Sequence, residues 1–403
     1  MTDVSSVIRG RAAAVREAGA VLRAASVDER AYWLVRAVEQ LELDAHRARS
    51  ALSDATGLSV PMVQWAIRTT LDTIGADSMR GLVRQAQGQS RHAVDPIRLL
   101  AVIVAGNVFT ASARGIVVPL LFGVPVLVKA SSKETMFPAM VRDALRAADA
   151  SLGAAMDLAV FPGGDVEREE ALTESADAVS VYGTDETITA MAPRLGDTPL
   201  IAHGHGVSVA YCGVAGLEHA QIDQTIAALS LDISAYDQRG CLSPQIVYVQ
   251  DTPSRSAADF GKRLADEGLG PLSRTLPRGP LPMAVGVAQA QWRGVAEVEG
   301  IVVRGDSYAV AIRPARPVRW SPAYRNVSLA PVRSLDEALR EMESFGSSLK
   351  CVGADPASLA DVRARLVAND TLQAYACAIG EMQKPPLDAP ADGRPVWEGL
   401  FRS

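Results

Sequence analysis

The sequence is poor in the residues that build disulfide frameworks and metal sites. Its 403 residues include only four cysteines and five histidines. The cysteines are widely spaced, with no Cys-x-x-Cys pair and no histidines at metal-ligand spacing. We therefore expect free thiols in a reducing cytoplasm and no metal centre. The four cysteines are Cys212, Cys241, Cys351 and Cys377.

Positive charge and long apolar runs are also scarce. The net charge is -6 and no basic stripe is present, which argues against nucleic acid or an anionic membrane surface and favours a small-molecule ligand. The most apolar run, residues 115–128, is interrupted by Pro119, Gly123 and Pro125, so we expect a buried helix and strand there and not a membrane span. The opening residues lack a charged segment followed by an apolar one, so no secretory signal is expected.

The hydrophobic pattern changes near residue 95. Before it, residues 8–25, 28–55 and 61–87 have the apolar spacing of surface helices, with Ser26 as a plausible cap and Gly57 as a stop. After it, short apolar runs without polar alternation alternate with amphipathic helices, which is typical of a parallel sheet covered on both faces. We predict an α/β protein of two domains. The predicted strands cover 97–104, 124–129, 158–161, 178–181, 199–203, 207–211, 246–249, 300–304, 308–312 and 349–352.

One cysteine is singled out by its surroundings. Asp237-Gln-Arg-Gly-Cys241-Leu-Ser-Pro-Gln245 lies between a helical pattern and the strand at 246–249. Gly240 allows a sharp turn before the sulfur, and Pro244 prevents a helix from continuing. Such a loop can present Cys241 to a cleft as a nucleophile. The alternative is that Cys241 is a small buried hydrophobe.

Three other places could contribute to a site, and each has a plain structural alternative. Asn107 follows the first strand and can donate to an oxyanion or simply cap a helix. Lys129 ends the next strand and can reach a cofactor hydroxyl or phosphate, or remain solvated. The pair His203 and His205 would lie on one face of a strand as a base or metal pair, or as ordinary loop histidines.

Further candidates lie at a strand-turn-helix segment. Val181-Tyr182-Gly183-Thr184 has a glycine at the turn, which leaves room for a pyrophosphate against the first N–H groups of the helix. Many α/β turns contain glycine, so the signal is weak alone.

The order of these pieces resembles the aldehyde dehydrogenase superfamily, and more closely its fatty acyl-CoA reductase branch, the LuxC-like proteins. The resemblance spans roughly residues 95–393. It is carried by Asp237-Gln-x-x-Cys241-x-Ser-Pro-Gln245 and by Gly380-Glu-Met-Gln-Lys-Pro-Pro386 followed by Asp392-Gly393. By position, Cys241 is similar to the nucleophile that forms a thioester with the acyl group. Asn107 and the Cys241 backbone N–H are similar to its oxyanion hole.

The resemblance also implies a nicotinamide cofactor. Lys129 resembles the lysine at the adenosine ribose, and Gly183 with Thr184 resembles the turn beside the pyrophosphate. Gly163 is carried over as a further cofactor-binding residue. In ordinary aldehyde dehydrogenases a glutamate follows the lysine by three residues, where this chain has Ser132, with Lys133 beside it. Because a carboxylate repels a 2′-phosphate and these side chains accept one, NADPH is expected in preference to NADH.

Three departures from the family pattern bear on the reaction. Aldehyde-oxidising members have Glu-Leu-Gly-Gly where this chain has His203-Gly-His-Gly206, and their glutamate activates the water that hydrolyses the acyl-enzyme. Without it, an acyl-enzyme is expected to persist and to accept hydride or exchange with a thiol. Arg325-Asn-Val-Ser-Leu-Ala-Pro331 replaces Glu-x-Phe-Gly-Pro, whose glutamate grips the nicotinamide ribose. The tail lacks a Trp-x-His before Asp392.

The sequence therefore predicts an NADPH-dependent reductase of an acyl thioester, carried by CoA, a carrier protein or a partner synthetase, with His203 or His205 as acid or base. The rivals are an oxidative aldehyde dehydrogenase, a cysteine acyltransferase or hydrolase without a nucleotide, and a nucleotide-binding scaffold with an inert cysteine. A homodimer or homotetramer is implied by the family. The predicted parts are N-terminal helices (1–79), an oligomerisation arm (80–96), a Rossmann-type cofactor domain (97–212), an α/β catalytic domain (213–379) and a C-terminal oligomerisation tail (380–403).

Overall fold

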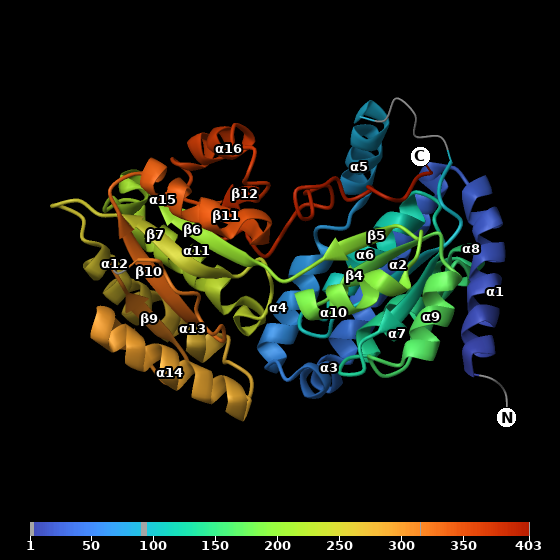
Figure 1. Ribbon diagram of the computed structural model, residues 1–403, viewed down its shortest axis with the longest axis horizontal. Coiled ribbons are helices and arrows are strands. Elements are labelled where there is room, and N and C mark those ends of the chain that lie inside the picture. The colour runs from blue at the N-terminus through green and yellow to red at the C-terminus, as the bar shows by residue number, and fades with distance from the viewer. Residues whose placement is uncertain (1–3, 90–94, 315, 403) are drawn as a thin grey trace.

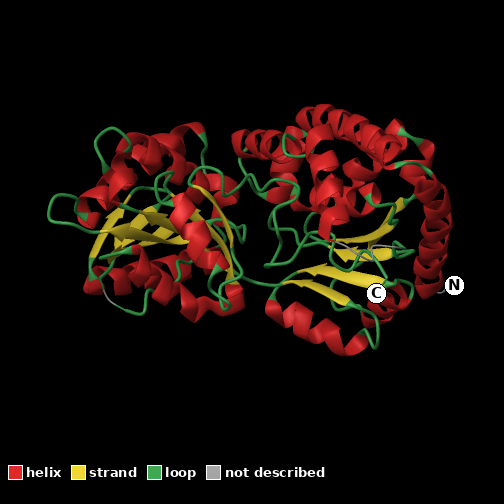
Figure 2. Ribbon diagram, turned by 90° about the horizontal axis from the view of Figure 1, so that it is seen from above, coloured by secondary structure: helices red, strands yellow, loops and turns green. Residues whose placement is uncertain are grey.

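The computed structural model of the protein describes residues 4–89, 95–314 and 316–402. The chain forms two lobes, and each lobe has one β-sheet with helices on its faces (Figure 2). Nearly all the strands of both sheets are parallel, and their burial on both faces explains the continuous apolar runs in the sequence. The predicted α/β class is confirmed. Among the described residues, no helix is both long enough and apolar enough to cross a membrane.

The first lobe has a five-stranded parallel sheet in the order β3-β2-β1-β4-β5. The chain runs outward from the central β1 first in one direction and then in the other, as in doubly wound nucleotide-binding folds. Such sheets bind ligands beyond the carboxyl ends of their strands. The strands are β1 Leu100–Ile103, β2 Val126–Ala130, β3 Met156–Val160, β4 Ala178–Tyr182 and β5 Leu200–His203.

Helices from the N-terminal part of the chain cover this sheet. Ser26 caps the second helix in a capping box with Glu29, and Gly57 ends the third at a φ of 66°. The predicted helix at 28–55 is two helices that meet at Ala48. The helices of this lobe are α1 Val4–Ala24, α2 Val27–Arg47, α3 Arg49–Thr56, α4 Val60–Leu71, α5 Ala76–Gln89, α6 Ala111–Leu121, α7 Met136–Ala148, α8 Ala150–Ala154, α9 Val166–Glu174 and α10 Asp185–Met191.

The second lobe has a seven-stranded sheet in the order β12-β11-β6-β7-β10-β9-β8, in which only the edge strand β8 is antiparallel. The elements of this lobe are β6 Val207–Cys212, β7 Pro244–Gln250, β8 Ile301–Arg304, β9 Ala309–Ile312, β10 Asn326–Val332, β11 Leu349–Ala354, β12 Tyr375–Ala378, α11 Ile222–Ser234, α12 Ala257–Arg263, α13 Gly270–Thr275, α14 Met283–Glu299, α15 Leu335–Met342 and α16 Leu359–Val367.

The position of β6 corrects the expected domain boundary. We placed residues up to 212 in the cofactor domain, but β6 pairs with β7 and β11 in the second sheet. The chain therefore passes between the lobes at residues 204–206, directly after β5. The error arose because β5 and β6 are both apolar and only three residues apart, and local pattern does not say which sheet a strand joins.

The C-terminal tail returns to the first lobe of its own chain (Figure 1). After β12 it crosses from one lobe to the other, and Trp397 and Leu400 join the core around α2 and α6. The backbone N–H of Ile97 donates to the carbonyl of Leu400, and Pro96 and Phe401 form an antiparallel bridge. The expected pairing of this tail with another chain stays a prediction. Of the expected arm, residues 80–89 end α5, and residues 90–94 lie outside the described residues, as do 1–3 and 403.

A buried carboxyl group holds the start of the tail. Asp232, on α11, is fully buried, and its Oδ2 accepts the backbone N–H of Gly380 at 2.5 Å. Burial raises the pKa of Asp232 from 3.8 to about 7, against the lowering effect of backbone N–H groups of Gly380 and Met382. A neutral carboxyl group is thus favoured in the folded protein well above the pH at which the unfolded chain ionises.

This shift predicts a pH-dependent stability. Because the folded-state pKa of Asp232 is raised, its contribution to the free energy of unfolding is fully present below about pH 4 and is lost as pH rises toward 7. The total loss over this range is about 4 kcal/mol. Asp232→Asn should lose this component, so its urea midpoint should fall less than that of the wild type between pH 5 and pH 8. The exposed Asp223 on the same helix supplies the control, since Asp223→Asn should keep the wild-type slope. Equal slopes for all three proteins would contradict the assignment.

Candidate active site

The cysteine loop begins with three residues in the left-handed region. Tyr236, Asp237 and Gln238 have φ values of 51°, 53° and 59°, although none is a glycine. Each such residue costs roughly 1 kcal/mol, so the conformation persists only where surrounding contacts impose it. The turn takes the chain from α11 to Gly240 and Cys241 in a few residues.

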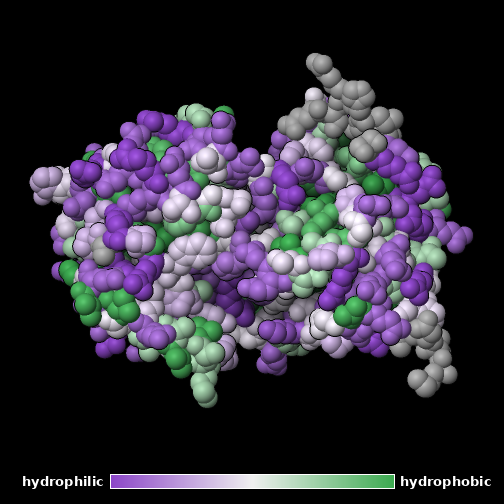
Figure 3. Space-filling view, viewed as in Figure 1, coloured by the Kyte–Doolittle hydropathy of each residue, from purple (hydrophilic) through white to green (hydrophobic). Residues whose placement is uncertain are grey.

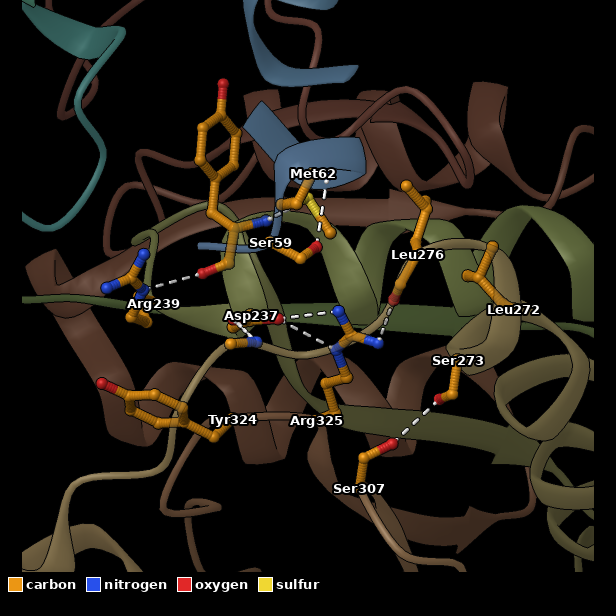
Figure 4. Close-up of polar contacts among 12 residues, drawn as sticks. Ser59, Met62, Asp237, Arg239, Leu272, Ser273, Leu276, Ser307, Tyr324 and Arg325 are labelled. Atoms are coloured by element: carbon orange, nitrogen blue, oxygen red, sulfur yellow. Dashed lines mark hydrogen bonds and ion pairs between the residues drawn. The ribbon is translucent and has the colours of Figure 1, made fainter. Parts of the chain in front are cut away.

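A buried ion pair imposes that conformation (Figure 4). Both guanidinium atoms Nε and Nη2 of Arg325 donate to Asp237 Oδ1, at 3.1 and 2.7 Å, and both residues are at most 1% exposed. Asp237 Oδ2 accepts the N–H of Gly279, and Arg325 also donates to the carbonyl of Leu276. Arg325 itself ends a second left-handed run, residues 323–325. The ion pair therefore stabilises both strained segments. The Arg325 side chain is fully engaged in contacts behind the cysteine loop.

Cys241 is the one solvent-exposed cysteine, while the other three are buried. Ser208 Oγ donates to the carbonyl oxygen of Cys241 at 2.6 Å and so ties the loop to β6. The residue is exposed, yet enough protein surrounds it that burial raises the pKa of the Cys241 thiol. The Asp392 carboxylate also raises this pKa, whereas Lys350 and the N–H groups of Cys241 and Leu242 lower it.

Asn107 lies against the cysteine loop. Its Nδ2 donates to the carbonyl oxygen of Arg239 at 2.9 Å, and among the described residues its second N–H has no partner. A side chain on Gly240 would come within 3.2 Å of Val108, so the glycine allows this close approach. The alternative that Asn107 caps a helix is wrong, because α6 begins four residues later and its N-cap, Thr110, makes no capping bond.

His203 belongs to a cluster beside the cysteine. Its Nδ1 lies 2.7 Å from Asp392 Oδ2, and its ring stacks on Tyr182 with centroids 4.2 Å apart. Asp392 Oδ1 accepts from Lys350 Nζ. Together the histidine and lysine hold the pKa of Asp392 below its usual value, although burial opposes this. Among the described residues, Nε2 of His203 makes no hydrogen bond, so this nitrogen remains available to a reactant.

His205 does not join this cluster. The strand β5 ends at His203, so the two imidazoles do not share a strand face as expected. The exposed His205 ring instead lies 5.8 Å from that of Trp320. The glycines between and after the histidines make room for neighbours, since a Cβ on Gly206 would meet Lys350 at 2.3 Å and one on Gly204 would meet Asp185 at 2.6 Å.

Lys129 has the features expected of a cofactor ligand. Its side chain is 7% exposed, its ammonium lies 5.4 Å over the ring of Phe161, and burial lowers its pKa. Among the described residues Nζ makes no hydrogen bond, so a ribose hydroxyl would satisfy a buried donor. Gly163 lies beside it, because a Cβ there would be 4.0 Å from Nζ. This corner of the sheet therefore fits the sugar of a nucleotide.

The turn after Lys129 leaves the expected phosphate-binding side chains free. Ser132 and Lys133 are both exposed, whereas the nearby Glu134 is buried and accepts the N–H of Phe137 at the start of α7. Gly106 permits this turn to approach the loop of Asn107, since a Cβ there would lie 2.8 Å from Ser131. The one carboxylate of this turn, Glu134, is thus directed to the helix backbone, and the two exposed side chains are uncharged or positive.

The turn at Gly183 and Thr184 gives weaker support. The hydroxyl of Thr184 accepts the N–H of Thr187 as an N-cap, and the first turn of α10 contains the carboxylates of Asp185 and Glu186. Two negative charges beside the expected pyrophosphate would repel it. The assignment of this turn to the cofactor stays a prediction.

The comparison with known proteins decides the family. A family model described as acyl-CoA reductase (LuxC) matches residues 43–396, which is most of the chain. The chain belongs to the acyl-CoA reductase (LuxC) family. The resemblance seen in the sequence is confirmed. The family makes the protein an oxidoreductase of the NAD(P)-dependent type, with acyl-CoA as the substrate that the family implies, and no curated protein matches.

Solved structures show the fold of this acyl-CoA reductase family member. It is similar to aldehyde dehydrogenase 21 from Physcomitrella patens in complex with succinate, at 15% identity and a TM-score of 0.73, over 99% of this chain and 90% of that one. It is also similar to an NAD-dependent aldehyde dehydrogenase from Sinorhizobium meliloti, at 14% identity and a TM-score of 0.72, over 94% of this chain and 80% of that one. A third similar structure is an NADP-dependent glyceraldehyde-3-phosphate dehydrogenase from Bacillus halodurans, complexed with NADP. The identity is 16% and the TM-score 0.69, over 93% of this chain and 83% of that one. The predicted aldehyde dehydrogenase-like fold is confirmed.

Three residues of the candidate site were not identified as site residues in the sequence. Asp392 was noted only as part of a family motif, and nothing in the local pattern linked it to His203, which is 189 positions away. Tyr182 was seen only as part of a turn, and Lys350 carried no signal. On the face drawn in Figure 3, the surface between the two lobes is largely hydrophilic.

Proposed function

We propose that the protein is an NADPH-dependent reductase that converts an acyl thioester to an aldehyde through an acyl group held on Cys241. The observations that support this most are the exposed Cys241, the contact of Asn107 with the loop that carries it, and the His203–Asp392 pair, whose carboxylate acts on the Cys241 thiol. A nucleophile, an amide donor and an oriented imidazole are the groups that acyl transfer requires.

The first half-reaction transfers the acyl group to sulfur. His203 Nε2 takes the proton of the Cys241 thiol, the resulting thiolate attacks the carbonyl carbon, and the oxyanion is held by the free N–H of Asn107 and the backbone N–H of Cys241. The carbonyl re-forms as the bond to the carrier sulfur breaks, and His203 gives its Nε2 proton to the leaving thiolate. Each hydrogen-bond donor is useful here because it stabilises charge that exists only in the tetrahedral species.

The second half-reaction releases the aldehyde. When bound, the nicotinamide supplies a hydride to the carbonyl carbon. The same two donors hold the oxyanion of the resulting thiohemiacetal until its carbon–sulfur bond breaks, which regenerates the Cys241 thiolate. Lys129 and Gly163 would hold the adenosine ribose, and the exposed Ser132 and Lys133 would favour a 2′-phosphate, so NADPH is preferred over NADH.

A panel of acyl-CoA thioesters of increasing chain length tests this proposal. The expected result is oxidation of NADPH that forms aldehyde and free CoA in equal amounts, with NADH a poorer donor. The matched variant Lys133→Glu should reverse the preference, because a carboxylate repels the 2′-phosphate. Absence of aldehyde with every thioester, CoA-bound or carrier-bound, would contradict the proposed reaction.

The His203–Asp392 pair also supports a second candidate, a cysteine hydrolase. A histidine whose Nδ1 is held by a carboxylate is the usual general base of hydrolases, so it can replace the glutamate missing from this position. The two functions separate cleanly. A hydrolase would release CoA catalytically without NADPH, whereas the reductase would release about one CoA per Cys241 and then stop.

A further inference from the structure

Asp392 is delivered by a tight and strained turn of the tail. Its φ is 54°, in the left-handed region, and the turn is closed by hydrogen bonds in both directions between Ala391 and Arg394. Gly393 follows at a φ of 73°, and a Cβ there would lie 2.5 Å from Gln373. A non-glycine residue in this conformation costs free energy, which the contacts of its side chain must offset.

Those contacts join three separate parts of the chain. Asp392 comes from the tail, His203 from the end of β5 in the first lobe, and Lys350 from β11 in the second lobe. Their side chains are only 11–17% exposed, and each carboxylate oxygen of Asp392 is used once. The tail therefore bridges the two lobes at the site. The predicted role of the tail in oligomerisation explains none of these contacts.

We propose that Asp392 is a positioning residue, which fixes the proton-bearing nitrogen of His203 and holds Lys350 beside Cys241. The inference rests on the proposed function in its assignment of His203 as the acid. Asp392 touches no reacting atom and acts through its two neighbours.

The geometry explains how the carboxylate would act on the imidazole. A carboxylate accepts but does not donate, so Nδ1 of His203 must donate to Asp392, and the reacting nitrogen is Nε2. Stacking on Tyr182 limits rotation of the ring. Nε2 is thereby left facing away from the carboxylate and is the ring nitrogen that can pass a proton to the leaving thiolate.

The same carboxylate sets the charge around the sulfur. Asp392 and Lys350 act on Cys241 with opposite signs, and Tyr182, His203 and the buried Cys351 are further titratable groups in this region. Arg114 faces Tyr182 and donates to the tail carbonyls of Leu387 and Ala389. Loss of the Asp392 charge should therefore make the Cys241 thiol more acidic and leave the His203 ring without its hydrogen-bond partner.

The test compares Asp392→Asn with Asp388→Asn, which removes a carboxylate from the same tail outside the cluster. Two readouts are needed: the pH dependence of Cys241 alkylation by iodoacetamide without substrate or cofactor, and the pH profile of CoA release. Asp392→Asn should alkylate at lower pH than the wild type, yet release CoA about 10- to 100-fold more slowly at every pH. Asp388→Asn should match the wild type in both.

Lys350→Met provides a second test, which does not depend on whether Asp392→Asn disturbs the tail. Its alkylation should shift to higher pH, opposite to that of Asp392→Asn, and Asp392→Glu should recover part of the CoA release. An unchanged alkylation profile in both Asp392→Asn and Lys350→Met, in folded protein, would overturn the proposal. Because alkylation needs no thioester, this outcome is distinct from failure of the proposed reductase, which would appear as absence of aldehyde.

Discussion

Replacing Cys241 with alanine is expected to abolish aldehyde formation, with turnover falling roughly 10⁴-fold or more, because no other group can carry the acyl intermediate. The remaining cysteines cannot substitute for it, since all are buried and burial raises the pKa of the Cys212 thiol well above its usual range. The measurement is aldehyde produced per enzyme with the best thioester of the panel.

Cys212→Ala is the control for loss of a thiol. It removes a cysteine of β6 from the core of the second lobe, so it should cost some stability and keep most of the turnover. NADPH should still quench or enhance tryptophan fluorescence in Cys241→Ala as in the wild type, because the expected ribose contacts at Lys129 are untouched. Aldehyde formation that survives in Cys241→Ala would remove the thioester from the mechanism.

The second large effect is expected from the buried ion pair. Arg325→Met leaves the Asp237 carboxylate buried and without its cation, which should lower the free energy of unfolding by about 3–5 kcal/mol. It should also slow alkylation or acylation of Cys241, because the three left-handed residues before the cysteine lose the contact that imposes their conformation. Urea unfolding and the rate of CoA release in the first turnover are the two measurements.

A surface pair and a double variant make this prediction specific. Arg319, which is largely exposed and lies 3.7 Å from Glu299, belongs to the same stretch, and Arg319→Met should change the urea midpoint little. In Asp237→Asn/Arg325→Met the unpaired charge is gone, so part of the stability should return. If the double variant is no more stable than Arg325→Met, the loss in free energy of unfolding comes from packing and not from the unpaired carboxylate.

The sequence predicted the structural features that depend on neighbouring residues, such as helix ends and turns. Ser26 and Gly57 were identified as helix boundaries because capping depends on a few adjacent residues, and most of the buried strands followed from their continuous apolar runs, although β10 and β12 were not predicted. The loop around Cys241 was also evident, since glycine and proline restrict the backbone wherever they occur. Asn107 was placed at the carboxyl end of β1 by the same reasoning.

Long-range pairings could not be predicted in this way. Asp237 and Arg325 are 88 positions apart, and Asp392 and His203 are 189 positions apart. Only the tertiary fold brings such charges together, and nothing in either segment specifies its partner. For the same reason the sequence placed β6 in the wrong sheet and did not indicate that the tail docks on its own first lobe. The family resemblance identified Cys241 as a site residue, but it did not identify Lys350 or Tyr182.

The two connections between the lobes have a mechanical consequence. The chain crosses at residues 204–206 and again in the tail, and the crossings are bound side by side by the His203–Asp392 contact and by Arg394, which donates to the carbonyl of Ala202. The lobes are also joined where Tyr236 packs in the core of the first lobe. Any relative movement of the lobes would therefore displace the imidazole and the Asp392 carboxylate together, because both crossings are tied at that point.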